Sequence, residues 1–451
     1  MKRLENSYCY VATIDRVVAE SSVRLGLAPR GGVGERRTFF ADPGGDGDAY
    51  MAALNDIGDY DADRIRERLG AGGGGRPDHD SLVSAAFLLK GGFACAGDFW
   101  GINSHYWYMD ESTFCCSNNV FAVASIAGTD LSRESLWEYL FFLSPAGDRT
   151  WFQDVRKLRP GATILYDAAA HAVSSAEPFD HEAMLCERRG PELKEALAQF
   201  FEGAKSVLAG RRAAVSISAG SDSNTVLSCV RGFGLPHRTY SFGSRHLVET
   251  RQIEMNSKRL GFDWTLIDIS DFGSDWRDRF GETLLATNGL LNPNRTHYGE
   301  YYDSIPPDEA VFEGVMGSQF LKGEFAAGST ISQAHRTALA GVEPLDRIIR
   351  REYEGLPEPF LRGMIEYIDD VHGARLTNVN TSEGFRAFRS WAFEFIPGRI
   401  FAGILLLASQ DHGVYEPLVS PMILGSLSVS YTHLRAHETV LDLVCRLLLE
   451  K

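Results

Sequence analysis

The chain has little of what marks secreted, zinc-binding or membrane proteins. Its seven cysteines form no Cys-x-x-Cys pair and show no zinc-ligand spacing, which argues against a disulfide framework and a zinc module. No secretory signal and no uninterrupted apolar run of membrane-spanning length is present. We therefore expect a cytoplasmic protein of a reducing compartment, with no membrane partner, in which most cysteines are small core residues.

Positive charge is also scarce. The 451 residues include 45 Lys and Arg against 60 Asp and Glu, which gives a net charge of −15 at pH 7. Nucleic-acid binding needs clustered cations that neutralise phosphates, so this balance argues against a nucleic-acid partner. A hydrophobic content of 44% and a charged content of 23% are typical of a globular protein, and the length predicts about two domains.

One turn of small residues carries the strongest chemical signal. The apolar run before it predicts a buried strand, and residues 225–230 predict the helix that follows. The turn itself reads Ser218-Ala219-Gly220-Ser221-Asp222-Ser223. Its backbone N–H groups and the helix N-terminus suit an anion, its serine hydroxyls suit phosphate oxygens, and Asp222 suits Mg²⁺. The alternative is an ordinary turn in which Asp or Ser caps the helix.

The segments around this turn alternate between strand and helix. An amphipathic helix over 192–208 follows a polar linker at 187–191, and the turn is followed by strand 238–242, helix 249–260 and strand 264–269. Such alternation predicts a parallel, doubly wound sheet that binds ligands at the carboxyl ends of its strands. The chain has no Gly-x-x-x-x-Gly-Lys-[Ser/Thr] motif, so the turn is not the phosphate loop of kinases and GTPases.

The N-terminal part of the chain predicts short elements joined by turns. We expect strands over 8–17, 37–40, 106–109, 114–116, 120–126 and 162–166, a strand that begins at Gly97, a helix over 81–89, and glycine-rich turns at 31–34 and 70–75.

Four stretches resemble the asparagine synthetase superfamily. Ser218 to Ser223 is similar to its S-G-G-x-D-S pyrophosphate loop, with Ala219 in place of the first Gly. Residues 310–323 resemble V-L-S-G-E-G-x-D-E-L-F-x-G, and 411–420 resemble G-V-E-x-R-x-P-F-L-D. Residues 80–170 are similar to the family's glutamine amidotransferase domain, chiefly in 151–161, which end in Pro-Gly like T-x-F-x-G-I-x-x-L-x-P-G-H.

This resemblance implies an α/β fold in two domains and a tail. Residues 1–183 would form a degenerate amidotransferase-like α+β sandwich of the N-terminal-nucleophile type. Residues 190–427 would form a doubly wound parallel-sheet ATP-pyrophosphatase domain with a helical C-terminal part. Residues 428–451 stop resembling the family, and 430–439 read like translated adapter sequence, so we expect a non-native tail there.

The resemblance also implies ATP and Mg²⁺ as cofactors, and it assigns candidate residues to them. The candidates for ATP and pyrophosphate are Ser218, Ala219, Gly220, Ser221, Asp222, Ser223, Ser241, Phe242, Gly314 and Lys322. The candidates for the metal are Asp222 and Ser318. Lys322 has a second interpretation as a solvated lysine, and Glu249 is either the acid of the family's D-E-x-x-x-A segment or a first-turn residue that favours the helix dipole.

Departures from the family pattern leave three functions open. Lys2 stands where glutamine-hydrolysing members have their nucleophilic Cys, and Cys9 lies in a strand pattern, so we expect no glutaminase activity. Val315 stands at the Glu of the acyl-transfer step, Ser318 at the second metal-binding Asp, and Gln319 at the next Glu. The chain would be an AMP-forming amide ligase that makes asparagine from ammonia, a natural-product ligase like the β-lactam synthetases and lasso-peptide cyclases, or a non-catalytic member. Its partner would be a small-molecule or peptide carboxylate, and a homodimer stays open.

Overall fold

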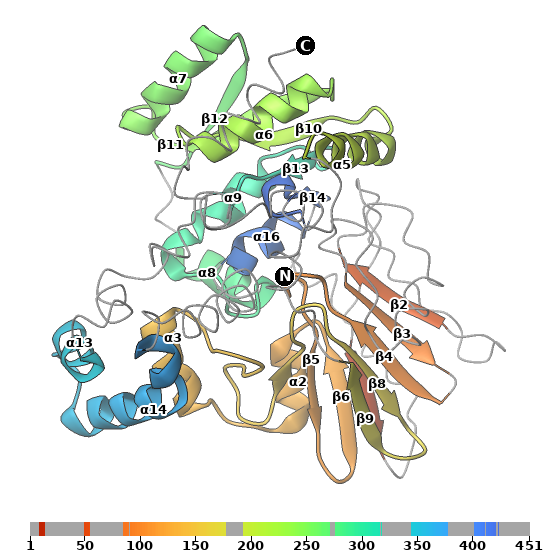
Figure 1. Cartoon of the computed structure of the whole chain (residues 1–451), viewed down its shortest axis with the longest axis vertical. Coiled ribbons are helices and arrows are strands. Elements are labelled where there is room, and N and C mark those ends of the chain that lie inside the picture. The colour runs from red at the N-terminus through yellow and green to blue at the C-terminus, as the bar shows by residue number, and fades with distance from the viewer. Residues whose placement is uncertain are drawn as a thin grey trace.

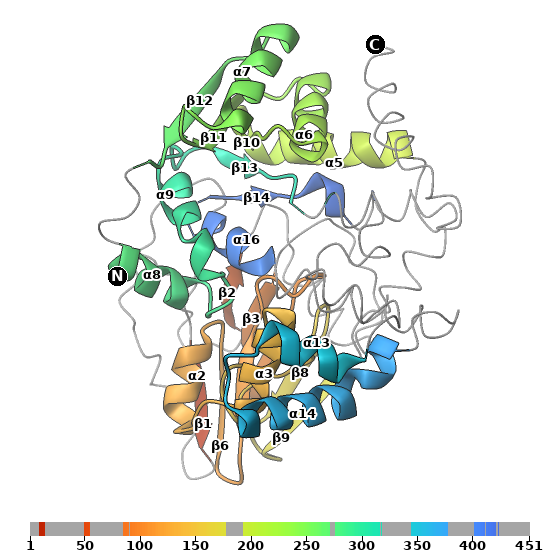
Figure 2. The same cartoon turned by 90° about the vertical axis from the view of Figure 1, so that its left-hand side faces the viewer.

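The structure is a computed structural model, and it describes residues 9–13, 49–54, 84–89, 91–176, 193–270, 276–315, 317, 344–377, 401–410, 412–420 and 423. Antiparallel sheets gather at one end and a parallel sheet lies at the other, with helices between them (Figures 1 and 2). Among the described residues, no helix is long and apolar enough to cross a bilayer.

Several predictions from the sequence lie outside the described residues. They concern Lys2, the segments 31–34, 37–40, 70–75 and 187–191, the site candidates Ser318, Gln319 and Lys322, and the tail at 428–451.

The N-terminal part is built from two antiparallel sheets. The first has the order β1 (Cys9–Thr13), β6 (Thr113–Ser117), β5 (Tyr106–Met109) and β7 (Arg156–Lys157). The second has the order β2 (Ala49–Leu54), β3 (Ser84–Leu89), β4 (Gly92–Ala96), β8 (Thr163–Asp167) and β9 (Ala172–Ala176).

Aromatic rings fill the space between these two sheets. Phe114 of β6 stacks on Tyr166 of β8 with ring centroids 4.1 Å apart, and Tyr10 of β1 stacks on Phe93 of β4 at 4.8 Å. Each pair joins one sheet to the other, as the inner faces of a β-sandwich do. The cysteines Cys95, Cys115, Cys116 and Cys229 are buried, as expected of small core residues.

Three predictions for this part were wrong. Residues 84–89 form strand β3 rather than a helix, because β2 and β4 pair with this run on both sides. No strand begins at Gly97: β4 ends at Ala96, and the Asp98 carboxylate accepts the N–H groups of Trp100, Ile102 and Asn103 in a turn.

The third error concerns residues 120–126. They form helix α2 (Val120–Ala127) rather than a strand, because Asn119 accepts the N–H groups of Phe121 and Ala122 as an N-cap, and Gly128 ends the helix in the left-handed conformation.

The second half contains a parallel sheet of five strands. Their order is β12 (Trp264–Asp268), β11 (His237–Gly243), β10 (Ala213–Ser216), β13 (Ala310–Phe312) and β14 (Val414–Tyr415), and every neighbouring pair is parallel. The predicted α/β class and parallel sheet are confirmed. The order reverses at β10, with β11 and β12 on one side and β13 and β14 on the other.

Helices cover both faces of the parallel sheet (Figure 1). One group comprises α5 (Leu193–Leu208), α6 (Ser221–Gly232) and α7 (Val248–Leu260), all predicted from the sequence. The other comprises α9 (His297–Asp303) and α16 (Ala402–Ala408), and α8 (Trp276–Ala286) packs against α16 on the side away from the sheet. On the α5 face, Phe312 stacks on Tyr415 at 4.6 Å and lies near Phe201. A continuous apolar core therefore surrounds the sheet.

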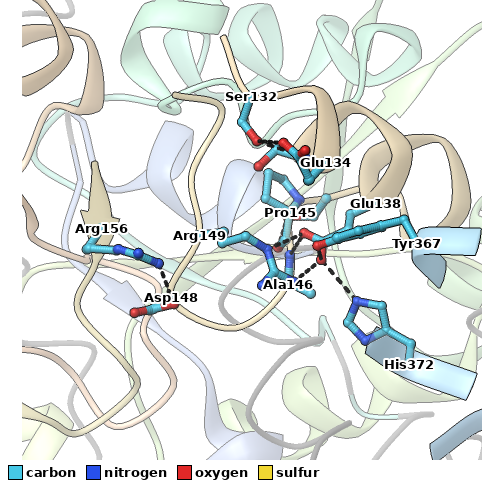
Figure 3. Close-up of polar contacts among 12 residues, drawn as sticks. Ser132, Glu134, Glu138, Pro145, Ala146, Asp148, Arg149, Arg156, Tyr367 and His372 are labelled. Carbon is cyan, nitrogen blue, oxygen red and sulfur yellow. Dashed lines mark hydrogen bonds and ion pairs between the residues drawn. The ribbon is translucent and has the colours of Figure 1, made fainter. Parts of the chain in front are cut away.

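A buried glutamate ties the N-terminal part to the C-terminal helices. Glu138 lies on α3 (Arg133–Phe142) and is completely buried. Its carboxylate accepts hydrogen bonds from the Ala146 N–H (2.7 Å), the Arg149 guanidinium and the Tyr367 hydroxyl (2.9 Å), and His372 Nε2 lies 3.0 Å away (Figure 3). Tyr367 and His372 belong to α14 (Glu358–Thr377), which follows α13 (Leu345–Glu352).

Candidate functional site

The turn of small residues lies at the carboxyl end of β10 and is held by its own serines. Ser223 Oγ accepts the N–H of Ser218 at 3.0 Å, Ser218 Oγ accepts the N–H of Gly220 at 3.1 Å, and the two hydroxyl oxygens are 2.9 Å apart. Helix α6 begins at Ser221 with Gly220 as its N-cap. Asp222 lies in the first turn and does not cap the helix, so the expected capping by Asp or Ser is wrong, while the interpretation as an ordinary turn is not tested by this geometry.

Two further segments contact this turn. Glu249, in the first turn of α7, accepts the N–H of Ala219 at 3.3 Å, so both interpretations of Glu249 remain compatible with its position. A Cβ added to Gly314 would lie 3.1 Å from the backbone of Asp222 and Ser223, and one added to Gly317 would lie 2.9 Å from Asp222 Cγ. Gly314 and Gly317, which follow β13, therefore lie directly against the turn, and a side chain at either position would crowd its atoms.

The candidates on β11 lie one strand away. Ser241 is buried, and Phe242 is half-buried near the carboxyl end of the strand. The Phe242 ring packs against α9, with ring centroids 4.8 Å from Tyr298 and 5.1 Å from Tyr301. Phe242, a predicted ATP-binding residue, thus contributes to a cluster of aromatic rings at this edge of the sheet.

The donor set suits a phosphate better than a metal ion. Serine hydroxyls and the start of α6 meet at the turn, as phosphate binding requires. In the part of the chain that the structure describes, no group of three or more His, Cys, Asp and Glu could hold a metal. Of the two predicted metal ligands, Asp222 is described and Ser318 is not.

A buried glutamate that sequence reasoning overlooked lies at the same edge. Glu313 directly follows β13, and its carboxylate accepts hydrogen bonds from the hydroxyls of Ser216 and Tyr302, the latter at 2.9 Å. Burial raises the pKa of Glu313 to about 7, although these two hydrogen bonds oppose the increase. The carboxyl group therefore titrates near neutral pH.

A second overlooked glutamate follows the next strand. Glu416 comes directly after β14 and is buried, and neither carboxylate oxygen has a hydrogen-bond partner among the described residues. Burial and the charge of Glu313 raise its pKa well above the ordinary value; the Val315 N–H, which approaches the carboxylate without reaching hydrogen-bond geometry, opposes this. The signal in the sequence that could have revealed both glutamates is an acidic residue directly after the short apolar segments that form β13 and β14.

Comparison with known proteins adds no assignment. No protein-family model matches the chain, and no curated protein matches it either.

Proposed function

We propose that the chain is an AMP-forming amide ligase of the asparagine synthetase type, in which ATP activates a carboxylate and an amine then displaces AMP. The observation that carries this proposal is the position of the Ser218–Ser223 turn. It leads from β10 into α6 at the strand where the sheet order reverses, which is where open α/β sheets bind their ligands.

In this proposal the turn holds the pyrophosphate that leaves ATP. The hydroxyls of Ser218 and Ser223 and the N-terminus of α6 donate to phosphate oxygens. The resemblance assigns Mg²⁺ to Asp222 and Ser318, and a metal ion bound there would supply positive charge for the leaving group. Catalysis then rests mainly on positioning and on stabilisation of developing negative charge. Gly314 and Gly317 support this role, because they allow the segment after β13 to lie against Asp222.

The N-terminal sandwich would then be an amidotransferase-like domain without glutaminase chemistry. Lys2 replaces the nucleophilic Cys, so the amine comes from free ammonia or from the substrate itself. The acceptor is a small-molecule or peptide carboxylate. A natural-product ligase of the β-lactam synthetase or macrocyclase kind shares all these features and remains part of the proposal.

A non-catalytic nucleotide-binding protein is the second candidate. The residue that favours it is Val315, an apolar side chain at the position where the family has its acyl-transfer Glu.

Exchange of labelled pyrophosphate into ATP separates the two candidates. The protein is incubated with Mg²⁺, ATP, labelled pyrophosphate and a panel of carboxylic acids, with aspartate among them. A ligase gives exchange that depends on one carboxylate, because adenylation is reversible. ATP binding without exchange for any acid would favour the non-catalytic candidate, and asparagine formation from aspartate and ammonium would identify the substrate.

A further inference from the structure

Three polar side chains form a row across neighbouring strands at the carboxyl edge of the parallel sheet. Val215 of β10 pairs with Phe312 of β13, which pairs with Tyr415 of β14. The register continues by one residue, since the Glu313 N–H donates to the Tyr415 carbonyl at 3.0 Å. Residues in register on parallel strands point to the same face, so Ser216, Glu313 and Glu416 lie side by side.

The two carboxyl groups in this row are not equivalent. Glu313 accepts hydrogen bonds from Ser216 and from Tyr302 of α9. Glu416 is only 4% exposed, and both of its oxygens lack a hydrogen-bond partner among the described residues. A buried carboxylate without a partner is strongly unfavourable. Such a group is retained when it has a task in a bound state.

We propose that Glu313 and Glu416 bind the positively charged amino group of the second substrate, an ammonium ion or a primary amine. The identity of this cation as a substrate rests on the proposed function, whereas the binding site itself rests on the buried pair. The pair lies at the same sheet edge as the Ser218–Ser223 turn, because Ser216 ends the strand that leads into the turn.

The number and kind of donors favour ammonium over a metal ion. Mg²⁺ and Ca²⁺ in proteins take six or more oxygen ligands, and Zn²⁺ takes about four ligands that include His or Cys, whereas the described residues here offer two carboxylates and no third acidic, His or Cys group. An ammonium group instead donates up to three directed hydrogen bonds, which two carboxylates can accept. A carboxylate beside the bound ammonium can also take the proton that the amine must lose before its lone pair attacks a carbonyl.

Binding of the cation should release a proton. The raised pKa values mean that the empty pair keeps a proton near pH 7, and a bound cation replaces it. The titratable groups that interact with Glu313, apart from Glu416, are Tyr298, Tyr301 and Tyr302 of α9. The pKa values of these tyrosines are all raised, chiefly by burial, so their hydroxyls stay neutral.

The test is calorimetric titration of the full chain with methylammonium chloride at constant ionic strength, with and without Mg²⁺–ATP. Tetramethylammonium chloride, which carries the same charge without N–H donors, and potassium chloride serve as comparison cations. Glu416→Gln is the test variant. Glu309→Gln is the matched control, because Glu309 is a buried carboxylate at the other end of β13 that is already paired with Tyr240 and Arg238.

We expect methylammonium to bind and both comparison cations to bind at least about tenfold more weakly. Affinity should rise from pH 6 to pH 8. Glu416→Gln should weaken binding about 30-fold or more and raise the melting temperature of the free protein, while Glu309→Gln should keep the affinity. Ser216→Ala, which removes one donor to Glu313, provides a second variant should Glu416→Gln fail to fold, and it should change methylammonium affinity several-fold.

Three results would overturn the inference: no methylammonium binding in either state, equal binding of potassium or tetramethylammonium, or unchanged binding in Glu416→Gln. Mg²⁺–ATP binding, measured on the same preparations, keeps the two proposals apart. Methylammonium binding without ATP binding would refute the proposed function and support the cation site. ATP binding without methylammonium binding would refute the cation site and leave the proposed function intact.

Discussion

The buried glutamate of α3 provides a quantitative test of how the N-terminal and C-terminal parts are joined. Glu138 has no solvent exposure, and its carboxylate receives donors from Arg149, Tyr367 and the Ala146 backbone. Glu138→Gln keeps the shape but removes the charge and turns an amide donor toward these donors. Loss of one partner of a buried ion pair costs about 3–5 kcal/mol, and we take about 3 because the Arg149 side chain is 30% exposed.

Thermal unfolding at pH 7 measures this effect. A loss of about 3 kcal/mol should lower the melting temperature of Glu138→Gln by about 6 °C or more. Glu134→Gln is the matched control, because Glu134 is exposed on the same helix and, among the described residues, accepts a hydrogen bond only from the Ser132 hydroxyl, at 3.2 Å (Figure 3). The control should melt within about 1 °C of the parent protein. If Glu138→Gln did so too, the network would contribute no stability and the reasoning would be refuted.

The pH dependence of the melting temperature gives an independent check on the direction of the Glu138 pKa shift. Burial alone would raise the pKa of Glu138, but the hydrogen bonds from His372, Arg149 and the Ala146 N–H outweigh it, so the pKa lies below the ordinary value of 4.5. A depressed carboxyl pKa stabilises the folded state above the unfolded pKa and stops doing so as the pH falls through the folded pKa. The melting difference between Glu138→Gln and the parent should therefore shrink below about pH 4, and a constant difference would contradict the assignment.

Three further predictions concern the motifs and the tail. Glutamine should not be hydrolysed, because Lys2 replaces the nucleophile; glutamate release that disappears in Cys9→Ser would contradict this. Deletion of 430–451 should lower the melting temperature by less than about 5 °C, and a larger fall would show that the tail is integral. Gly314→Ala should destabilise the protein by about 1–3 kcal/mol in urea unfolding and weaken ATP binding, because its Cβ meets the Asp222 backbone at 3.1 Å. Gly281→Ala, a helical position with open space around it, is its control and should stabilise by about 0.5–1 kcal/mol, and equal effects of the two would count against the packing argument.

Three strands of the parallel sheet, β10, β11 and β12, could be predicted from the sequence because each carries its own signal, whereas the short strands β13 and β14 were not predicted. Apolar strands of four to seven residues alternate with amphipathic helices, and the helix predicted over 249–260 is observed over Val248–Leu260. The N-terminal part was harder, because the periodicity of a short apolar run does not separate strand from helix. Residues 120–126 look like a strand until the N-cap Asn119 and the terminating Gly128 are taken into account.

The candidate site was predictable only in part, for a topological reason. Placement of the Ser218–Ser223 turn and of Ser241 at one edge follows from the rule that parallel strands end together. Glu313 and Glu416 were overlooked because they lie about 100 residues apart in the sequence, and only the register of β13 and β14 makes them neighbours. Sequence alone specifies neither that register nor which polar groups in it lack a partner.

The central claim is that the Ser218–Ser223 turn binds Mg²⁺–ATP through Asp222, and calorimetric titration of Asp222→Asn with Mg²⁺–ATP tests it most directly. Asn keeps the shape of the side chain but removes the charge, and the N-cap of α6 is Gly220, so helix capping is not altered. We expect the parent protein to bind Mg²⁺–ATP and the variant to lose at least about tenfold in affinity with an unchanged melting temperature. Equal affinity of the two proteins, or no ATP binding by the parent, would contradict the account.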